Sequence, residues 1–599
     1  MNENNTEYIN SDAERAKIEE QFKKAHRRNS LIILLLVACI GLGFMYFKLS
    51  SQTGLDYIDG NVLKIARTGS PSTGNIWKNE SFVSQLAWSS LFVTDATFTE
   101  VNSGLAETYT VSGDGLTYTI TLKENLKWSD GEVLDLDDVV YSLEAYVLNA
   151  STNNTVTTAL NKIAGVDEWK EIAVQSWENG GTHSLEGLSA EGNVLTITLD
   201  SPHTTFALAL TQFVPLPEHC FTDVDPSTIT SGLEFFSNPV CSGMFMVDCI
   251  NELEDLELIR NPNYHDTQTD IERVIMYYDH KNMFIDHYST TNITEMVSYR
   301  SMQGFEEYNV NAEFYRYFVF NQAADYNVVE MVPKLDDTGA EILDENGDPV
   351  LEENIESIDY GDEREENEII SNVLVRQAIY HAIDRPALLD SAYLNSGELA
   401  FANMDDEGNP HYVYEYDPEK AEQLLIEAGY DFDRPFTIAY YHTDANTAAF
   451  LDKMKVYLED IGLTVRLVYT NGSDEFGNNR MYGTREYDML LKALSAFNLE
   501  DWFNEYLSTN GNMHSLMGTE IFDGPMSDLQ ASTNVANYRM IVEEIQQLEY
   551  DTLYKLPLFT LNDMVYINGN RLSVPEDIIF GNTRYRSDLR IDEWYIKKA

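Results

Sequence analysis

The sequence contains little cysteine and no paired-cysteine motif. Only four cysteines occur among 599 residues, and no CxxC pair or Cys/His spacing typical of structural zinc is present. Cys39 lies in an apolar segment near the N-terminus, which leaves Cys220, Cys241 and Cys249 for the rest of the chain. Three cysteines cannot close completely into disulfides, so we expect free or partly paired structural cysteines.

Positive charge is also scarce. The chain has 39 Lys and Arg against 99 Asp and Glu, a formal net charge of -60. Such a surface repels phosphate backbones and anionic lipid headgroups. The composition therefore excludes nucleic acid as a partner, and any attachment to a membrane requires a dedicated segment.

Motifs of common catalytic and metal-binding classes are missing as well. The sequence has no GxSxG, HExxH, SxxK or phosphate-loop pattern, so a peptidase or an ATPase would need an unrecognised site. The eleven histidines form no HxxxH-type pair, and the Asp and Asn spacing at 344–348 lacks the full calcium-loop pattern. We expect no cofactor and no metal site.

One long apolar run is present. Residues 31–47, LIILLLVACIGLGFMYF, carry no charge and are close to the roughly 17 to 25 residues that span a bilayer. Basic side chains precede the run, which predicts a cytoplasmic tail at 1–30 and an extracytoplasmic remainder; they are Lys23, Lys24, Arg27 and Arg28. Residues 36–39 also match a lipobox, with Cys39 as the lipidated residue after cleavage. We favour an uncleaved anchor because the apolar run continues past Cys39, and both alternatives tether the protein.

Periodicity predicts a mixed α/β protein of roughly three or four domains. Alternating patterns predict strands from 61 and at 116–122, 193–199, 436–442 and 464–469, and helices are predicted from about 136, at 417–429 and through FLDKMKVYLEDIG. The stretch NVLVRQAIYHAIDRPALL has apolar residues at helical spacing, with Asn372 placed to cap the first turn and a break before Pro386. Residues 325–370 are acidic, and their glycine turns suggest a solvated hairpin.

A series of longer motifs runs from about residue 60 to the end. It comprises GLAETYTVSGDGLTYTITLKENLKWSDGEVLDLDDVVYSLE, FVPLPEHCF, NPVCSGMFMV, LELIRNPNYH, NVLVRQAIYHAIDR, YDPEKAEQLLIEAGY, IGLTVRLVY, YDMLLKAL and LPLF. In this order the motifs resemble those of the extracellular solute-binding proteins of family 5, the oligopeptide, dipeptide and nickel receptors of ABC importers.

The resemblance implies a periplasmic-binding-protein-like fold of type II, with two lobes and an extra subdomain. Carried onto this chain after a linker at 48–59, it assigns 60–98, 208–320 and 556–599 to lobe I, 99–207 to the subdomain, and 321–555 to lobe II with the acidic insertion 325–370. It implies a binding protein that captures peptides or peptide-like solutes by hinge closure and delivers them to a permease. The alternatives are a surface receptor, sensor or adhesin with the same fold, and a peptidase with an unrecognised site.

Two segments correspond to ligand-binding segments of the family. Family peptide receptors neutralise the ligand amine with an Asp in a segment resembling GWxxDxxDP, and here KALSAFNLEDWFNEYL places Phe497 at that position. Glu500 or Asp501 supplies the charge from a shifted register, or both form an acidic helix N-terminus. The other segment, RTGSPSTGN, resembles the cleft-facing loop after the first strand. We expect ligand contacts from Thr68, Gly69, Ser70, Leu494, Ser495, Phe497, Asn498, Glu500, Asp501 and Trp502.

Overall fold

The computed structural model describes a defined set of residues, and everything below concerns these. They are 61–67, 81–149, 154–178, 185–222, 224–229, 233–250, 255–278, 285–322, 331–334, 351–353, 369–400, 403–404, 410–411, 414–471, 479–496, 499–518, 520–532, 535–580 and 585–597. Contacts group 63–597 into one unit. The predicted anchor at 31–47 and Cys39 lie outside the described residues, among which no helix is long and apolar enough to cross a bilayer.

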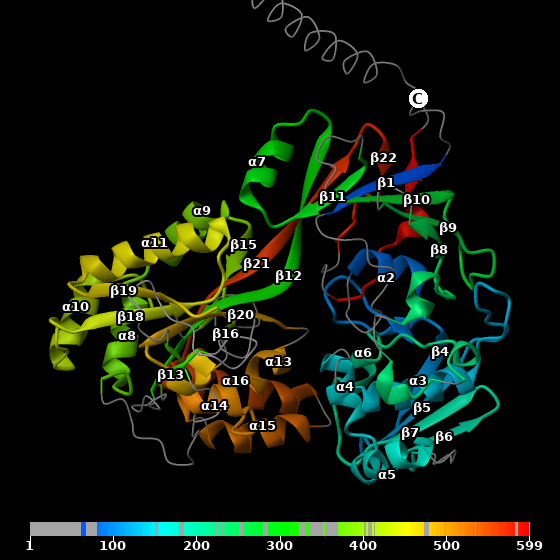
Figure 1. Ribbon diagram of the computed structural model, residues 1–599, viewed down its shortest axis with the longest axis horizontal. Helices are drawn as coiled ribbons and strands as arrows, with labels where there is room; N and C mark the ends of the chain where they lie inside the picture. Colours follow the sequence, from blue (N-terminus) through cyan, green and yellow to red (C-terminus); the bar gives the residue numbers. More distant parts are fainter. Residues whose placement is uncertain are drawn as a thin grey trace, which may run out of the picture. The chain divides into compact units, whose positions relative to one another are not determined.

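A mixed sheet of eleven strands organises the chain. Its order is β19-β18-β20-β12-β21-β11-β1-β10-β9-β8, and β15 also pairs with β21. The strands are β1 (Val62–Arg67), β8 (Phe245–Ile250), β9 (Leu256–Arg260), β10 (Arg273–Tyr278), β11 (His287–Thr290), β12 (Phe305–Phe320), β15 (Gly397–Leu399), β18 (Pro435–Tyr440), β19 (Thr464–Tyr469), β20 (Met489–Ser495) and β21 (Lys555–Asn568). Figure 1 shows β12 and β21 as the long strands at the centre of the drawing.

The two long strands contribute to separate hydrophobic cores along their lengths. Val310 and Val565 belong to the core that is built from residues before 310 and after 565. Phe318 and Leu556 belong to a core built from residues between 318 and 559. Antiparallel pairing of β12 with β21 covers most of both strands, but the register shifts between Asn311 and Phe314 and again between Arg316 and Tyr317. The pair of strands β12 and β21 therefore connects the two cores, and its pairing is irregular between them.

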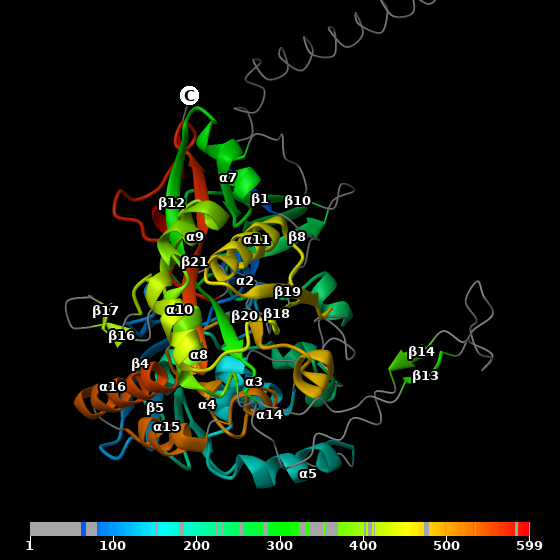
Figure 2. The same cartoon turned by 90° about the vertical axis from the view of Figure 1, so that its left-hand side faces the viewer.

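Helices cover both faces of the sheet on the side of β18, β19 and β20 (Figure 2). Successive side chains of a strand point to opposite faces, and β12 follows this rule: Phe318 and Phe320 pack with one helical layer, whereas Tyr317 and Val319 pack with the other. The first layer contains α8 (Val373–His381), α9 (Arg385–Tyr393), α10 (Pro418–Glu427) and α11 (Ala445–Asp460). The second contains α13 (Leu499–Asn504), α14 (Gly511–Met517), α15 (Asp523–Gln530) and α16 (Val535–Thr552).

A second sheet belongs to the core near the N-terminus. Its order is β4-β5-β7-β6, with every neighbouring pair antiparallel. The elements are β4 (Ala106–Val111), β5 (Thr117–Leu122), β6 (Leu188–Glu191), β7 (Val194–Thr198), α3 (Leu136–Leu148), α4 (Asn154–Leu160), α5 (Val166–Glu178) and α6 (Phe206–Ala209). Alternation in TYTITL buries Tyr118, Ile120 and Leu122 against this core. Asp135 begins α3 with a reciprocal capping box to Asp138.

Shorter elements complete the described chain. They are α2 (Ser81–Ala87), β2 (Phe92–Val93), β3 (Asn102–Ser103), η2 (Glu218–Cys220), η3 (Pro226–Thr228), η4 (Glu234–Ser237), α7 (Ile293–Arg300), β13 (Met331–Pro333), β14 (Leu351–Glu353), β16 (Asn403–Met404), β17 (Pro410–His411), the π-helix η6 (Asn479–Thr484), η7 (Glu520–Phe522), β22 (Leu572–Ser573), η8 (Ile591–Glu593) and β23 (Tyr595–Ile596).

Most locally encoded predictions are confirmed. Asn372 caps α8 through Leu374 N, and Asp384 caps α9, whose first turn contains Pro386. The predicted strands at 116–122, 193–199, 436–442 and 464–469 correspond to β5, β7, β18 and β19. Antiparallel β13 and β14 form the two sides of the hairpin expected within 325–370. Cys220, Cys241 and Cys249 are free thiols. The lobe and subdomain boundaries remain predictions.

Candidate functional site

A cavity of about 210 Å³ lies where the two long strands meet both halves of the sheet. Its walls contain Thr291 directly after β11, His442 and Asp444 two and four residues after the end of β18, and the irregular segments of β12 and β21. The lining residues are Thr291, Phe314, Arg316, Tyr393, Ser396, His442, Asp444, Asn446, Leu561, Asn562 and Asp563. The site thus combines residues from the predicted lobe I, the predicted lobe II and the strands that join them.

Strand direction explains why these residues meet. Strand β1 is parallel to β11, and β18 is parallel to both β19 and β20. Parallel strands end at the same edge, and in open α/β sheets ligands bind beyond the carboxyl ends of the strands. Asn446, in the first turn of α11, donates from Nδ2 to the Thr291 carbonyl over 3.2 Å, which joins the two walls directly. Through β21 and β12, β11 runs antiparallel to β18 and β20, so the carboxyl ends of the two strand groups approach the cavity from opposite directions, and the cavity lies beyond both.

Arg316 is the strongest hydrogen-bond donor in the cavity wall. Only 4% of the residue is exposed, and Nη2 donates to Thr447 Oγ1 over 2.6 Å. The remaining guanidinium atoms Nε and Nη1 have no acceptor in hydrogen-bonding geometry among the described residues. An isolated buried cation with unpaired N–H groups is costly. An acceptor such as a carbonyl or carboxylate oxygen of a ligand would satisfy this group.

Asp444 and His442 set the charge around Arg316. Burial acts to raise the pKa of Asp444, but the hydrogen bonds from Thr447 and the charge of Arg316 outweigh this effect, so the pKa lies below its ordinary value. Burial and then the Arg316 charge lower the pKa of His442 to about 4. At neutral pH the wall therefore presents a cation, an ionised carboxylate and a neutral imidazole.

Two of the predicted ligand residues lie at the end of β20. Ser495 pairs with Phe314 and Leu494 pairs with Tyr315, so Ser495 shares the face of the sheet that carries the cavity residue Phe314. Leu494 packs against the core of the opposite face. The Ser495 carbonyl accepts a hydrogen bond of 2.9 Å from the Tyr585 hydroxyl, which comes from the C-terminal segment.

The predicted residues on α13 are largely buried. Glu500 is 5% exposed, and burial raises its pKa to about 7 although Tyr538 donates a hydrogen bond to it. Trp502 donates from Nε1 to Glu549 over 2.7 Å and belongs to the core of this layer. Asp501 is half-buried. The structure places Glu500 and Trp502 in internal contacts, and their predicted ligand role stays a prediction.

The other predicted ligand residues cannot be placed. Thr68, Gly69, Ser70, Phe497 and Asn498 lie outside the described residues. Sequence reasoning in turn missed Arg316, Asp444 and Asn446, which line the cavity. The available signal was a single arginine within the apolar, aromatic strand sequence FYRYFVF, where a buried charge requires a partner. Asp444 was overlooked because the helix was expected to begin near 450, whereas α11 begins at Ala445 with Asp444 as its cap.

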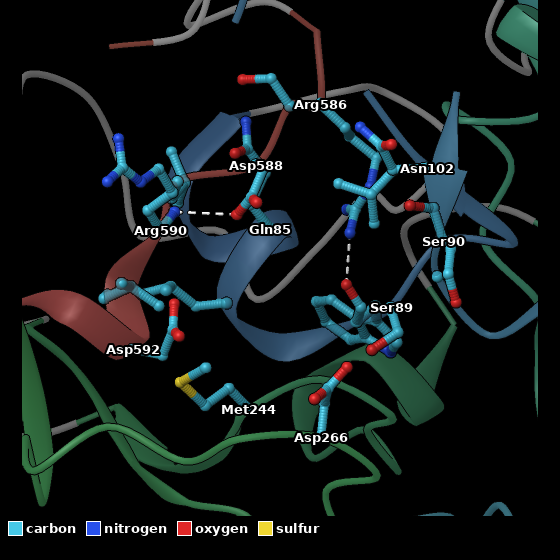
Figure 3. Close-up of a pocket in the computed structure, with 18 of the residues that line it drawn as sticks. Gln85, Ser89, Ser90, Asn102, Met244, Asp266, Arg586, Asp588, Arg590 and Asp592 are labelled. Carbon is cyan, nitrogen blue, oxygen red and sulfur yellow. Dashed lines mark hydrogen bonds between the residues drawn. The ribbon is translucent and has the colours of Figure 1, made fainter. Parts of the chain in front are cut away.

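A second cavity, of about 250 Å³, lies elsewhere, near α2 and the C-terminal segment (Figure 3). Asp266, Asp588 and Asp592 are among its lining residues, and Arg590 donates its backbone N–H to Asp588 over 2.8 Å. Every residue of its lining comes from 85–104, 211, 244, 264–267 or 586–592. Since the predicted lobe II contributes no lining residue among those described, movement of that lobe would not seal this cavity.

Comparison with known proteins agrees with this architecture. The model of the bacterial extracellular solute-binding proteins, family 5 Middle, matches residues 100–515. A Brucella ovis protein named as an ABC transporter peptide-binding protein is 24% identical over 381 residues, which are 63% of this chain and 61% of that protein. The chain therefore matches less than two thirds of the length of this relative. A dipeptide-binding protein of Lactococcus lactis is 30% identical over 171 residues, 27% of this chain and 28% of its own.

Solved structures show the same fold. The ABC transporter substrate-binding protein CtaP of Listeria monocytogenes superimposes with a TM-score of 0.69 at 19% identity, covering 90% of this chain and 99% of that chain. The oligopeptide-binding protein AppA of Bacillus subtilis, in complex with a nonapeptide, gives a TM-score of 0.60 at 18% identity, covering 90% and 99%. The similarity extends well beyond the segment that the family model matches.

Proposed function

Because the chain belongs to the bacterial extracellular solute-binding proteins of family 5, we propose that it captures peptides or peptide-like solutes outside the cytoplasm and delivers them to the permease of an ABC importer. In this proposal it is a binding protein and not an enzyme. The relatives named for peptide binding support this ligand class.

The observation that carries the proposal is the composition of the cleft cavity. Residues from both predicted lobes contribute to one enclosure, and Asn446 hydrogen-bonds across it to Thr291. A ligand that contacts both walls favours the closed arrangement by its difference in affinity for the closed and open states. The lining offers donors on Arg316 and acceptors on Asp444 and Asp563, which suits the alternating carbonyl and amide groups of a peptide backbone.

The predicted ligand residues extend this site. Strand β1 ends beside β11 and strand β20 ends beside β18, because each of these pairs is parallel. We therefore propose that the segments that follow β1 and β20 complete the cleft from its two sides. These segments contain Thr68, Gly69, Ser70, Phe497 and Asn498. Arg316, Asp444 and Ser495 form the described part of the same site.

Attachment to the membrane is also part of the proposal. The run at 31–47 and the basic residues before it support an N-terminal anchor, with lipidation at Cys39 as the alternative. Either device would keep the binding lobes at the outer surface next to a permease. The strong negative charge gives the folded part no affinity of its own for anionic lipid.

The test uses the full chain in detergent and a pool of synthetic peptides. Mass spectrometry of the peptides retained after gel filtration identifies a ligand, which we expect to compact the protein in small-angle scattering and to raise its melting temperature, since it binds only the folded state. Arg316→Gln should weaken binding by at least about tenfold, roughly 1.4 kcal/mol, because it removes a charged donor. The control Arg300→Gln alters an exposed arginine paired with Glu307 and should bind normally. Peptides that bind without compaction would refute hinge closure, and absence of any retained peptide would refute the ligand class.

A further inference from the structure

The chain brings together three possible metal ligands that are far apart in sequence. The ligand atoms of Asp130, His219 and Cys220 all lie within 4.8 Å of one another. His219 Nε2 is 2.9 Å from Asp130 Oδ2, and both side chains are about one third exposed. Cys220 is a half-buried free thiol. This cluster lies apart from the cleft cavity and contributes no residue to its lining.

Two well-ordered segments hold the cluster. Asp130 lies in the KWSDG turn, where its Oδ1 accepts the Glu132 N–H over 3.1 Å and Oδ2 remains directed to His219. His219 and Cys220 are adjacent in η2, and Cys220 N donates to the Pro217 carbonyl over 2.9 Å. The backbone thus fixes all three residues, while the side-chain tips remain free to adjust.

Further hydrogen bonds fasten each of these two segments to its surroundings. Glu218 N donates to Asp138 Oδ1 over 2.8 Å, which joins η2 to the first turn of α3. Ser129 exchanges two hydrogen bonds with Cys241: Ser129 N donates to the Cys241 carbonyl, and Cys241 N donates to Ser129 Oγ. The cluster is therefore built on a rigid base and does not depend on a single loop conformation.

We propose that Asp130, His219 and Cys220 bind a divalent cation of the zinc class. An imidazole nitrogen, a thiolate and a carboxylate form a donor set that suits Zn²⁺ and the similar ion Co²⁺, and not Mg²⁺ or Ca²⁺. Bond lengths of about 2.0 to 2.3 Å place tetrahedral ligands roughly 3.3 to 3.8 Å apart, so the three tips need to move by about 1 Å or less. The exposed side supplies a water molecule as the fourth ligand.

Proton balance follows from the ligand types. In the metal-free cluster a proton on His219 Nε2 donates to Asp130 Oδ2. Binding moves this proton to Nδ1 through solvent, the thiol releases its proton to solvent, and the cation bonds to Nε2, Sγ and a carboxylate oxygen. No electron is transferred. The acidic side chains of Glu218 in η2 and of Asp135 and Asp137 at the start of α3 add a favourable field for a cation.

In a second cluster, the ligand atoms of Asp248, Cys249 and Glu257 also lie within 4.8 Å of one another, but the Arg273 guanidinium already pairs with its carboxylates. Arg273 Nη1 is 2.5 Å from Glu257, and its Nη2 is 3.8 Å from Asp248. A metal ion there would have to displace or repel a guanidinium, and no imidazole is available in the cluster. It therefore provides an internal control with one thiol and two carboxylates.

The test measures cobalt and zinc binding by the full chain, purified in detergent without a histidine tag under reducing conditions. We expect one Co²⁺ per chain with a thiolate-to-cobalt charge-transfer absorption that Zn²⁺ abolishes by competition. Cys220→Ser should remove this absorption, and His219→Gln and Asp130→Asn should each weaken binding at least tenfold. Cys249→Ser and Cys39→Ser should leave the spectrum and the stoichiometry unchanged.

Each alternative outcome refutes the proposal. Absorption that persists in Cys220→Ser, or that disappears in Cys249→Ser or Cys39→Ser, would assign the ion to another thiol. Absence of the band in the wild-type chain at micromolar Co²⁺ would show that the three side chains do not form a site. Melting temperatures measured without metal check that the variants fold. If Cys220→Ser does not fold, His219→Gln, which changes an exposed side chain, takes its place in the binding test.

Discussion

Substitution of Lys555 tests how much a buried network of charged side chains stabilises the fold. Lys555 begins β21, is 0% exposed, and donates from Nζ to the Trp502 carbonyl over 2.8 Å. Nζ lies 3.4 Å from the centre of the Trp502 ring and 3.5 Å from a Glu505 oxygen. Burial lowers the pKa of Lys555 to about 8, although Glu505 and Glu549 act to raise it. We predict that Lys555→Met destabilises this part of the protein substantially.

The expected magnitude follows from what the substitution leaves behind. Glu505 keeps Lys492 at 3.5 Å and the Tyr317 hydroxyl at 2.6 Å. Glu549 accepts hydrogen bonds from two neutral groups, Trp502 Nε1 and the Tyr506 hydroxyl, so the substitution removes the cation that acts on it. Removing one partner from a buried ionic network costs about 3 to 5 kcal/mol. For the unit 63–597, an unfolding entropy of about 2.1 cal/mol/K per residue amounts to roughly 1.1 kcal/mol/K, so the melting temperature should fall by roughly 3 to 5 °C.

Differential scanning calorimetry at about pH 7.5 measures this decrease. Lys455→Met is the matched control, since Lys455 forms an exposed i,i+4 pair with Glu459 at 3.6 Å that contributes about 0.5 kcal/mol or less. The double variant Lys555→Met/Glu549→Gln should recover part of the loss because it also removes the uncompensated carboxylate. If Lys555→Met melts within about 1 °C of the control, the network does not stabilise the fold as argued.

Three further outcomes are expected. The pKa of Glu500 is raised from 4.5 to about 7, so the folded state binds a proton that the unfolded chain releases, and the stability of the protein falls as pH rises through this range. The melting temperature of Glu500→Gln minus that of the wild type should therefore be larger at about pH 8 than at about pH 4.5. An equal difference at both pH values would contradict the assignment. Deletion of residues 1–50 should yield a soluble, folded protein, whereas persistent membrane association would place the attachment elsewhere. N-acetylation of a bound peptide should weaken binding by less than about tenfold in calorimetry, because the predicted alignment places Phe497 where the family has its amine-binding acid and Asp444 is already engaged by Thr447. Loss of all binding would show that an acid holds the amine.

Local sequence signals predicted most of the elements. Capping residues, helical spacing and alternation act over a few neighbours, so Asn372, Asp384 and the TYTITL strand could be interpreted without tertiary information. The motif order identified the family, since many moderately specific segments had to agree. Both kinds of inference rely on information that is continuous along the chain.

The residues of the cleft lining and of the Asp130 cluster come from separate parts of the chain, so no continuous stretch of sequence predicts them. Arg316 and Asp444 come together only because β12 pairs with β20 while β18 leads into α11. Asp130 and His219 are 89 residues apart and meet through packing of η2 against the KWSDG turn. Spacing rules detect ligands that share one element, so a cluster assembled from two distant turns gave no signal in the sequence. The buried position of Glu500 was missed for the same reason, because its partner Tyr538 lies on α16.

The irregular pairing of β12 with β21 has a mechanical consequence. A regular ladder resists bending, whereas the two register shifts beside Phe314 and Arg316 remove continuous hydrogen bonding at one point of the ribbon. If the ribbon bends there, the pivot passes beside the cleft cavity, and the displacement of any atom grows with its distance from that pivot. The walls that touch the ligand near Arg316 would then move by a small distance, and the outer surfaces of the lobes would move by a much larger one. A small movement of the walls at the ligand would then produce a large displacement of the outer surface that the proposed permease would contact.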